Sequence, residues 1–396
     1  MKNLFTLAAA GMLTSAAFSA QAQITLNGVI AAAEIGTGIG KYQSLGSFTT
    51  PHVSNGGFGN WGLLQMYAAN GAANNGKLNL AVAGTLEKSG NGFQFYVDVP
   101  GVTGLSAGTV APAPAPAAST MFDGIAGTKF DFDVDMGIAL KGDAAGNVPQ
   151  VVTYTSNTTA NSRELSPVVP LTGGAVTMSV TTTVADYARF AGMRMAYKDT
   201  PSGSLVTDFP APPAGPGGAG NPGLANGGGA GSYGWEVELS RSALNLPAGG
   251  GQVKVMSVYV SGGGYFSSDV IPEIAGNGNT NIGNTPDFTT QPGNQNASFT
   301  FTLSTKQEDE AAVAMSVFPN PSLSQATITY RVLDKAANVT VTISDLMGRS
   351  VRTLSNGLQG VGIQTMTLNN NDLATGTYLV KVQVGDKTST RKVTLL

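Results

Sequence analysis

Cysteine is absent from the 396 residues, and His52 is the only histidine. The lack of cysteine excludes disulfide bonds, thiol catalysis and cysteine-ligated metals. With one histidine, a Ser-His-Asp triad would have to use His52. The surrounding sequence, TTPHVSNGG, contains neither a nucleophile turn nor a helix that carries a partner, so we interpret His52 as a loop residue.

Charged residues are also scarce. They make up only 11% of the chain, which holds 53 glycines. Residues 23–315 carry twelve basic and twenty acidic side chains, whereas residues 316–396 carry eight and four. An acidic body lacks the basic surface that would attract nucleic acids or anionic membranes. We therefore expect no nucleic acid among the partners of this protein.

A long apolar run occurs only near the N-terminus. Residues 4–18 are mostly apolar, follow Lys2 and precede an Ala-Gln-Ala sequence that ends at Ala22. This is the pattern of a secretory signal peptide, and the run is shorter than the roughly 20 residues that a membrane-spanning helix needs. We predict that residues 1–22 are a signal peptide cleaved before Gln23, and that the mature chain has no transmembrane anchor.

Apolar residues that alternate with polar ones indicate β-strands throughout residues 23–303. The clearest hairpin places the Asn91-Gly92 turn between two alternating runs. Residues 210–232 are so rich in glycine and proline that we interpret them as an excursion loop. Because no helical period of useful length appears, residues 23–303 are predicted to form an all-β sandwich body.

A second, smaller set of strands follows residues 304–316, which we interpret as a linker. Residues 326–332, 339–343 and 378–384 each alternate with a period of two, and glycines fall between the runs. Short strands at this spacing predict a small immunoglobulin-like antiparallel sandwich over residues 317–396. The predicted chain is therefore all-β, with two domains.

Several separated motifs of this C-terminal region occur in a fixed order: PNP, DLMGR, ATGTYLVKV and a basic-then-apolar ending. Together they resemble the type A C-terminal sorting domain of the type IX secretion system, found in Bacteroidetes. Ser344 stands where that family usually has an apolar residue. The positions that match the sorting signal are Pro319, Asn320, Pro321, Gly348, Arg349, Gly376, Tyr378 and Lys392.

The resemblance implies a route of export. Members of that family enter the periplasm by a cleaved signal peptide and cross the outer membrane through the type IX translocon. A surface sortase commonly removes the sorting domain, and the body is released or attached to lipopolysaccharide. The resemblance therefore implies a secreted or cell-surface protein whose partners include the translocon and the sortase.

The body is similar to the sandwich domains grouped with family 9 carbohydrate-binding modules. The similarity lies in the KLNLAVAGTLE hairpin that leads into FQFYVDVPG, and in WEVELSRSALNLPAGG followed by a central strand. Members of this broad group bind sugars, bind haem or have no known ligand. The resemblance implies an extracellular polysaccharide as a partner without identifying one.

One cluster of carboxylates stands out in the sequence FDFDVDMGIAL. We interpret it as a single long strand on which Asp131, Asp133 and Asp135 share one face. Neighbours on a face lie about 7 Å apart, and their mutual repulsion in water is roughly 0.6 kcal/mol. Two explanations stay open: a solvated strand face, or bound calcium, which prefers several carboxylate oxygens. No cofactor besides calcium is suggested.

Other side chains are weaker candidates for a site. Glu236 and Glu238 alternate with Trp235, so we expect the two carboxylates to face outward and the indole to lie in the core. A glycosidase needs two positioned carboxylates, and neither these nor Glu34 and Glu87 form an evident pair. The candidates for stacking on a sugar are Tyr265, Phe266 and Trp61.

These observations favour a non-catalytic body that binds an extracellular glycan. The low charge and the surface rich in Gly, Thr and Asn equally suit a structural or adhesive surface protein without a small ligand. A glycan-active enzyme is a third hypothesis, and it would require one of the carboxylates named above to act in catalysis.

Overall fold

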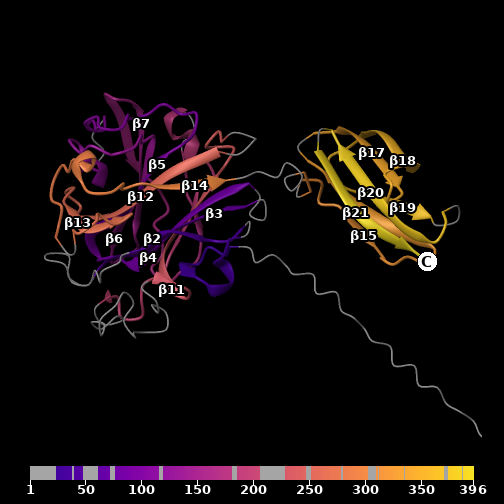
Figure 1. Cartoon of the computed structure of the whole chain (residues 1–396), viewed down its shortest axis with the longest axis horizontal. Helices are drawn as coiled ribbons and strands as arrows, with labels where there is room; N and C mark the ends of the chain where they lie inside the picture. Colours follow the sequence, from indigo (N-terminus) through magenta and orange to yellow (C-terminus); the bar gives the residue numbers. More distant parts are fainter. Residues whose placement is uncertain are drawn as a thin grey trace, which may run out of the picture.

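The structure is a computed structural model (Figure 1). It describes residues 24–37, 40–47, 61–71, 76–115, 119–180, 185–205, 228–246, 251–277, 280–301, 309–310, 312–333, 335–369, 373–385 and 387–396. His52, the predicted signal peptide with Ala22 and Gln23, and most of the predicted 210–232 loop lie outside these residues. No helix within the described ranges has the length and apolar character needed to cross a membrane.

The first sheet of the body is antiparallel and has the order β2-β3-β4-β11-β10-β9, with β1 paired to β11. Its strands are β1 (Val29–Ile30), β2 (Gln43–Ser47), β3 (Gly62–Gly71), β4 (Lys77–Thr85), β9 (Val176–Thr177), β10 (Arg194–Tyr197) and β11 (Ser232–Ser240). The central pair joins β4 to the much later β11, with Leu80 opposite Val237.

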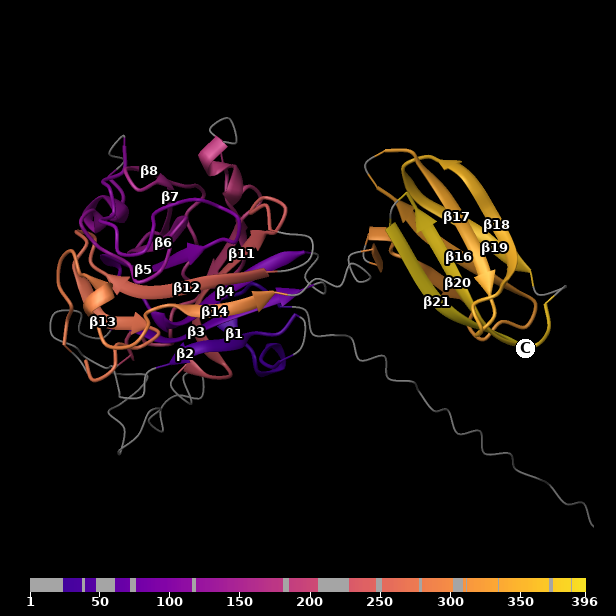
Figure 2. The same ribbon diagram turned by 45° about the horizontal axis from the view of Figure 1, so that its top comes forward.

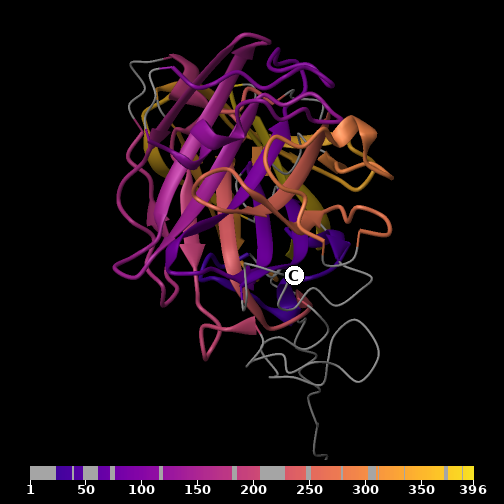
Figure 3. The ribbon, with the colours of Figure 1, turned by 90° about the vertical axis from the view of Figure 1, so that its left-hand side faces the viewer.

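The second sheet has the order β13-β12-β5-β6-β7-β8, with β14 paired to β12. Its strands are β5 (Ser89–Asp98), β6 (Met136–Asp143), β7 (Val148–Ser156), β8 (Thr159–Glu164), β12 (Gly251–Val260), β13 (Phe266–Ile271) and β14 (Ala297–Phe301). Short 3-10 helices lie in the connections: η1 (Ala32–Glu34), η2 (Met121–Ile125), η3 (Ala185–Phe190) and η4 (Phe288–Thr290). Figure 2 and Figure 3 show the strands of the body from two further directions.

The main core of the body combines the inward side chains of both sheets. Trp235 of β11 is fully buried there, as predicted, and stacks on Phe95 of β5 with 4.9 Å between the ring centroids. Both sheets are also covered on their outer faces. Ile24, Leu26, Ile30 and Tyr42 cover the first sheet, and aromatic loop residues such as Phe130 and Phe288 cover the second.

These outer layers overturn two expectations from the alternating pattern. The predicted strand over residues 130–140 begins only at Met136, and residues 130–135 are a loop that lays Phe130 and Phe132 on the second sheet. Glu236 and Glu238 do lie on the face away from the central core, but that face is covered. Glu236 is fully buried and Glu238 is 8% exposed.

The C-terminal strands form two further antiparallel sheets, of order β15-β16-β19 and β18-β17-β20-β21. The strands are β15 (Ser316–Phe318), β16 (Gln325–Val332), β17 (Ala337–Ser344), β18 (Ser350–Gln359), β19 (Gly362–Asn369), β20 (Gly376–Val384) and β21 (Lys387–Leu395). Apolar residues from both sheets, such as Ile328, Val341 and Val382, form a core of their own. This region is a small β-sandwich, and the all-β fold class predicted from the sequence is confirmed.

Candidate functional site

The three aspartates of the FDFDVD sequence act separately on the backbone of other loops. Asp131 Oδ2 accepts hydrogen bonds from Gln295 N (2.8 Å) and Asn296 Nδ2 (3.0 Å). Asp133 Oδ1 accepts one from Ala107 N at 2.8 Å. Asp135 is buried, and its Oδ2 accepts from Val99 N at 2.7 Å. The shared solvated strand face is therefore wrong, and each carboxylate fastens a different loop.

A metal site is not assembled from these groups. Within the part of the chain that the structure describes, no three His, Cys, Asp or Glu side chains are grouped so that they could hold a metal ion. Burial raises the pKa of Asp135 to about 6. Calcium binds ionised carboxylates, and burial disfavours the ionised form of Asp135.

The aromatic candidates do not form one platform. Phe266 is fully buried in the outer core of the second sheet, where its ring centroid lies 5.7 Å from that of Phe288. The expectation that Phe266 binds ligand is wrong, because β13 begins at this residue and turns its side chain inward. Trp61 is partly buried against the main core, whereas Tyr265 is 39% exposed.

Glu236 fastens the N-terminal segment to the first sheet. Its Oε2 accepts hydrogen bonds from Asn27 N (2.8 Å) and Gly28 N (2.7 Å), and its Oε1 accepts one from Tyr42 Oη (2.9 Å). Burial raises the pKa of Glu236 to about 7, against the three hydrogen bonds, which favour the ionised form. Glu34 similarly accepts a hydrogen bond from Thr25 N at 2.7 Å.

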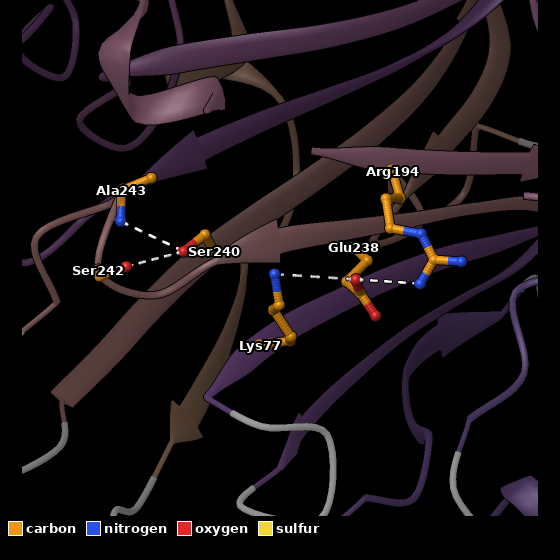
Figure 4. Close-up of polar contacts among 6 residues, drawn as sticks. All are labelled: Lys77, Arg194, Glu238, Ser240, Ser242 and Ala243. Carbon is orange, nitrogen blue, oxygen red and sulfur yellow. Dashed lines mark hydrogen bonds and ion pairs between the residues drawn. The ribbon is translucent and has the colours of Figure 1, made fainter. Parts of the chain in front are cut away.

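Glu238 lies two residues further along the same face, between two cations (Figure 4). Its Oε1 is 3.4 Å from Arg194 Nη1 and 3.9 Å from Lys77 Nζ. The carboxylates of β11 therefore have structural partners, and the structure does not pair them across a cleft as a glycosidase requires.

A pocket of about 210 Å³ lies between the loop after β5, η3 and the turn after β11. We call it the Arg189 pocket. Its walls are polar and apolar in about equal parts, and Arg189 is the single charged residue among those that line it: Val99, Val102, Ala188, Arg189, Ala243, Leu244 and Asn245.

Ser240 shapes one wall of this pocket. At the end of β11 its Oγ lies 2.9 Å from Ser242 Oγ and accepts a long hydrogen bond from Ala243 N at 3.5 Å (Figure 4). The backbone continues the turn, since Leu244 N donates to Ser240 O at 3.0 Å. Leu244 is buried in the core, and Asn245 adopts a left-handed conformation with φ 53° that asparagine tolerates better than most residues.

Arg189 retains hydrogen-bonding capacity in the pocket. Its Nη1 donates a hydrogen bond to the backbone oxygen of Asp135 at 3.3 Å, and no carboxylate of the described residues forms an ion pair with it. Burial lowers the pKa of the guanidinium, while the charge of Asp135 opposes that change. A guanidinium carries five N–H donors, so most of them stay available for a ligand.

In the C-terminal region, the predicted sorting motifs hold the ends of strands together. Asn320, from the PNP sequence, donates from Nδ2 to Lys392 O (2.8 Å) and accepts at Oδ1 from Thr394 N (2.9 Å). The side chain thus mimics a strand partner for β21. Tyr378 Oη donates to Ala374 O at 2.8 Å and fixes the approach to β20, which begins at Gly376.

The DLMGR sequence forms a tight turn between β17 and β18. Asp345 Oδ1 accepts hydrogen bonds from Met347 N (2.9 Å) and Arg349 N (3.0 Å), and Arg349 Nε donates to Oδ2 at 2.7 Å. These bonds, the arginine side chain above all, lower the pKa of Asp345. Gly348 has φ 82°, a backbone conformation that glycine adopts without strain.

Comparison with known families decides the identity of this region. Residues 316–395 match the family model described as the secretion system C-terminal sorting domain. The C-terminal sandwich is a secretion-system sorting domain. A domain of this family directs its protein to the cell surface or to the medium, and it implies contact with the secretion machinery.

Comparisons over the whole chain add little to this assignment. The chain is 11% identical to dimeric latent PorU from Porphyromonas gingivalis, covering 81% of this chain and 31% of that one at a TM-score of 0.20. A tetra-tandem repeat from the extending region of a large adhesion protein is 12% identical, covering 81% of this chain and 71% of that one at a TM-score of 0.18. At such scores neither likeness carries an argument. No curated protein matched the chain.

The surface of the sorting domain carries more exposed apolar side chains than the body. Large hydrophobic residues exposed on the described part of the sorting domain are Phe318, Leu323, Leu333, Leu346, Met347, Val351, Leu358, Val361, Ile363 and Leu396. Among the body residues that the structure describes they are Val110, Val168 and Tyr265. Met347 is 84% exposed at the tip of the DLMGR turn. Leu346 and Met347 are adjacent in the chain, so the DLMGR turn exposes apolar surface at one place on the domain.

Sequence reasoning missed the Arg189 pocket. Its lining residues come from three loops that are far apart in the chain, and none belongs to a recognisable motif. A weak signal is present in SRSALNLPAGG at the end of β11, where Asn245 follows the turn-forming serines Ser240 and Ser242. By contrast, every sorting residue named from the sequence lies in the domain that the family model matches.

Proposed function

We propose that this is a protein delivered by the type IX secretion system whose body is a non-catalytic module that binds an extracellular glycan containing a carboxylate. The sorting domain supports the delivery. The observation that carries the binding function is Arg189, a cation with available donors in a pocket that also presents apolar side chains such as Val102 and Leu244.

The chemistry of the pocket selects its ligand. A guanidinium binds a carboxylate through two parallel hydrogen bonds, and its weak hydration suits a partly buried site. The apolar walls from Val102 and Leu244 suit the C–H faces of a sugar ring. Because about 210 Å³ is smaller than the roughly 300–1,000 Å³ of most ligand pockets, we infer that one acidic sugar unit enters while the rest of the glycan stays outside.

The body is proposed to be non-catalytic because its buried glutamates have other partners. Glu236 and Glu34 accept hydrogen bonds from backbone N–H groups of the N-terminal segment, and Glu238 lies between two cations. A general acid or nucleophile must face the substrate, and these groups support the outer layer of the first sheet.

Replacing Arg189 with methionine should weaken binding of galacturonate oligomers at least tenfold. Hydrogen bonds to a charged group contribute about 1.5–3 kcal/mol, which corresponds to a factor of roughly 10–100. The measurement is calorimetric titration of the mature full chain. Arg163→Met is the matched control: Arg163 lies over the ring of Tyr187, 4.6 Å from its centroid, and does not line the pocket.

Equal affinities of the wild type and Arg189→Met would contradict the assignment of the pocket. If no acidic or neutral glycan binds and light scattering shows self-association of the chain, the structural or adhesive hypothesis replaces glycan binding. Hydrolysis of a glycan that stops in Glu236→Gln would instead establish an enzyme.

Replacing Met347 with aspartate should lower the secreted and surface-bound fraction severalfold, with the protein retained in the periplasm. Leu346 and Met347 are 61% and 84% exposed, so a charge there leaves the core intact but disrupts an apolar docking surface. Immunoblots of the cell fractions measure the effect. Val168→Asp, at a 48% exposed apolar position in the body, is the control and should be exported normally.

A further inference from the structure

The end of the predicted linker is attached to the sorting domain. Within the described part of residues 309–315, Val313 is 1% exposed and Met315 is 4% exposed, and both belong to the core of the sorting domain. We call residues 309–310 and 312–315 the docked segment. The linker predicted over residues 304–316 therefore includes a stretch that packs like part of the domain.

Polar contacts join the same segment to β21. Asp309 Oδ2 accepts a hydrogen bond from Thr388 N at 2.9 Å, and Asp309 Oδ1 lies 3.8 Å from Lys387 Nζ. Glu310 Oε2 is 3.2 Å from Arg391 Nη1. The acidic start of the docked segment thus meets the basic residues of an edge strand, because β21 ends its sheet. Covering an edge in this way also protects its unpaired backbone groups.

The docked segment is internally ordered as well. Ala314 N donates to Glu310 O at 2.8 Å, which closes one helical turn. Ala312 and Val313 form a wall of a pocket of about 200 Å³ whose other side includes Leu333, Ala337 and Val384. The segment therefore completes the surface of the sorting domain at this end, ahead of β15.

We infer that the unit a processing protease removes begins at or before Asp309, and that the cut falls on the body side of this residue. Proteases bind their substrates as extended chain, commonly by adding a strand, and they cleave where backbone is exposed and free to unfold locally. A cut between residues 309 and 316 requires the docked segment to detach first. This inference rests on the proposed removal of the sorting domain.

The test is the C-terminal mass of the body recovered outside the cell, together with limited proteolysis of the purified full chain by a protease of broad specificity. We expect the exported body to end before Asp309, and the fragment released in vitro to start at or before it. A body that ends within residues 309–316, or rapid cleavage there in vitro, would overturn the inference.

Variants distinguish docking from a chance preference of the protease. Val313→Asp should detach the segment and increase cleavage within residues 309–315 at least tenfold. Because that change could unfold the whole domain, Glu310→Arg provides a milder variant, and Glu310→Arg with Arg391→Glu should restore protection. If neither Glu310→Arg nor the double variant changes the rate of cleavage, the polar contacts do not hold the segment. The cleavage rate of Val313→Asp then tests whether apolar packing holds it.

The two readouts separate this inference from the proposed function. If the chain found outside the cell runs to Leu396, removal of the domain fails as a proposal, whereas protection of residues 309–315 in vitro would still establish the docked segment. Conversely, removal with a cut inside the segment would support the sorting route and contradict the docking.

Discussion

Replacing Glu236 with glutamine should stabilise the body at pH 8 by about 3 kcal/mol and leave its stability at pH 4.5 nearly unchanged. The carboxyl group has a pKa of about 7 in the folded protein against 4.5 when exposed. Between these values the folded state holds a proton that the unfolded state has lost. The stability of the wild type therefore decreases as pH rises from 4.5 to 7 and stays low above it.

Glutamine can reproduce the hydrogen bonds of the protonated acid. Its carbonyl oxygen can accept from Asn27 N and Gly28 N, as Glu236 Oε2 does, and its amide can donate to Tyr42 Oη, which then rotates its proton away. The uncharged side chain avoids the cost of an ionised group at a site with no exposure to solvent. Asp135, with a pKa raised to about 6, adds a decrease of the same sign in both proteins.

Chemical denaturation of the mature full chain at pH 4.5, 6 and 8 measures this difference. Glu238→Gln is the control on the same face, and it should lower stability slightly because it loses contacts with Arg194 and Lys77. Parallel pH profiles for the wild type and Glu236→Gln would show that the buried carboxyl does not titrate in this range.

Replacing Gly142 with alanine should destabilise the body by about 3 kcal/mol, because overpacking against the backbone forces strands to shift. An added Cβ would lie 1.7 Å from Glu87 O and 2.9 Å from Glu87 C. Both are main-chain atoms of the connection between β4 and β5, which belong to different sheets and do not form the hairpin predicted around Asn91-Gly92. Close to it, the pairing of β5 with β6 is irregular between Ser89 and Gly92. No side-chain rotation relieves such a contact.

The melting temperature should fall by roughly 6–12 °C, since about 1 kcal/mol corresponds to 2–4 °C in a domain of this size. Gly263→Ala is the matched control, because the nearest atom to its added Cβ is Ser261 Oγ at 3.9 Å. A melting temperature of Gly142→Ala within about 2 °C of the control would contradict the packing of β6 against the connection between β4 and β5.

The alternation of apolar residues predicted the strands of the sorting domain well, because strands such as β16 and β17 bury every second residue more deeply than its neighbours. Residues 326–332 form β16 and Trp235 lies in the core as expected. The same rule failed for Phe130 and Phe132. Alternation indicates which side chains are buried, but it does not show that the backbone pairs with a neighbouring strand. Phe130 and Phe132 are buried although they lie in a loop, and Asp131 holds this loop by accepting a hydrogen bond from Gln295 N.

The covered outer face could not be predicted for a related reason. Glu236 alternates with apolar neighbours, so the sequence predicts a side chain exposed to solvent, but Ile24, Ile30 and Tyr42 cover this face of the sheet and Glu236 is buried. Such a third layer depends on contacts between parts of the chain about 200 residues apart. The sorting motifs were predictable because their hydrogen bonds, as between Asp345 and Arg349, are mostly local.

The pairing of β11 with both β1 and β4 has a consequence for how fast the two parts of the chain reach their final form. Closing the first sheet requires Val29 to meet Tyr233, and such distant contacts make folding slow. The sorting domain contains hairpins between neighbouring strands, such as β20 with β21. We therefore expect the sorting domain to complete its fold before the body does.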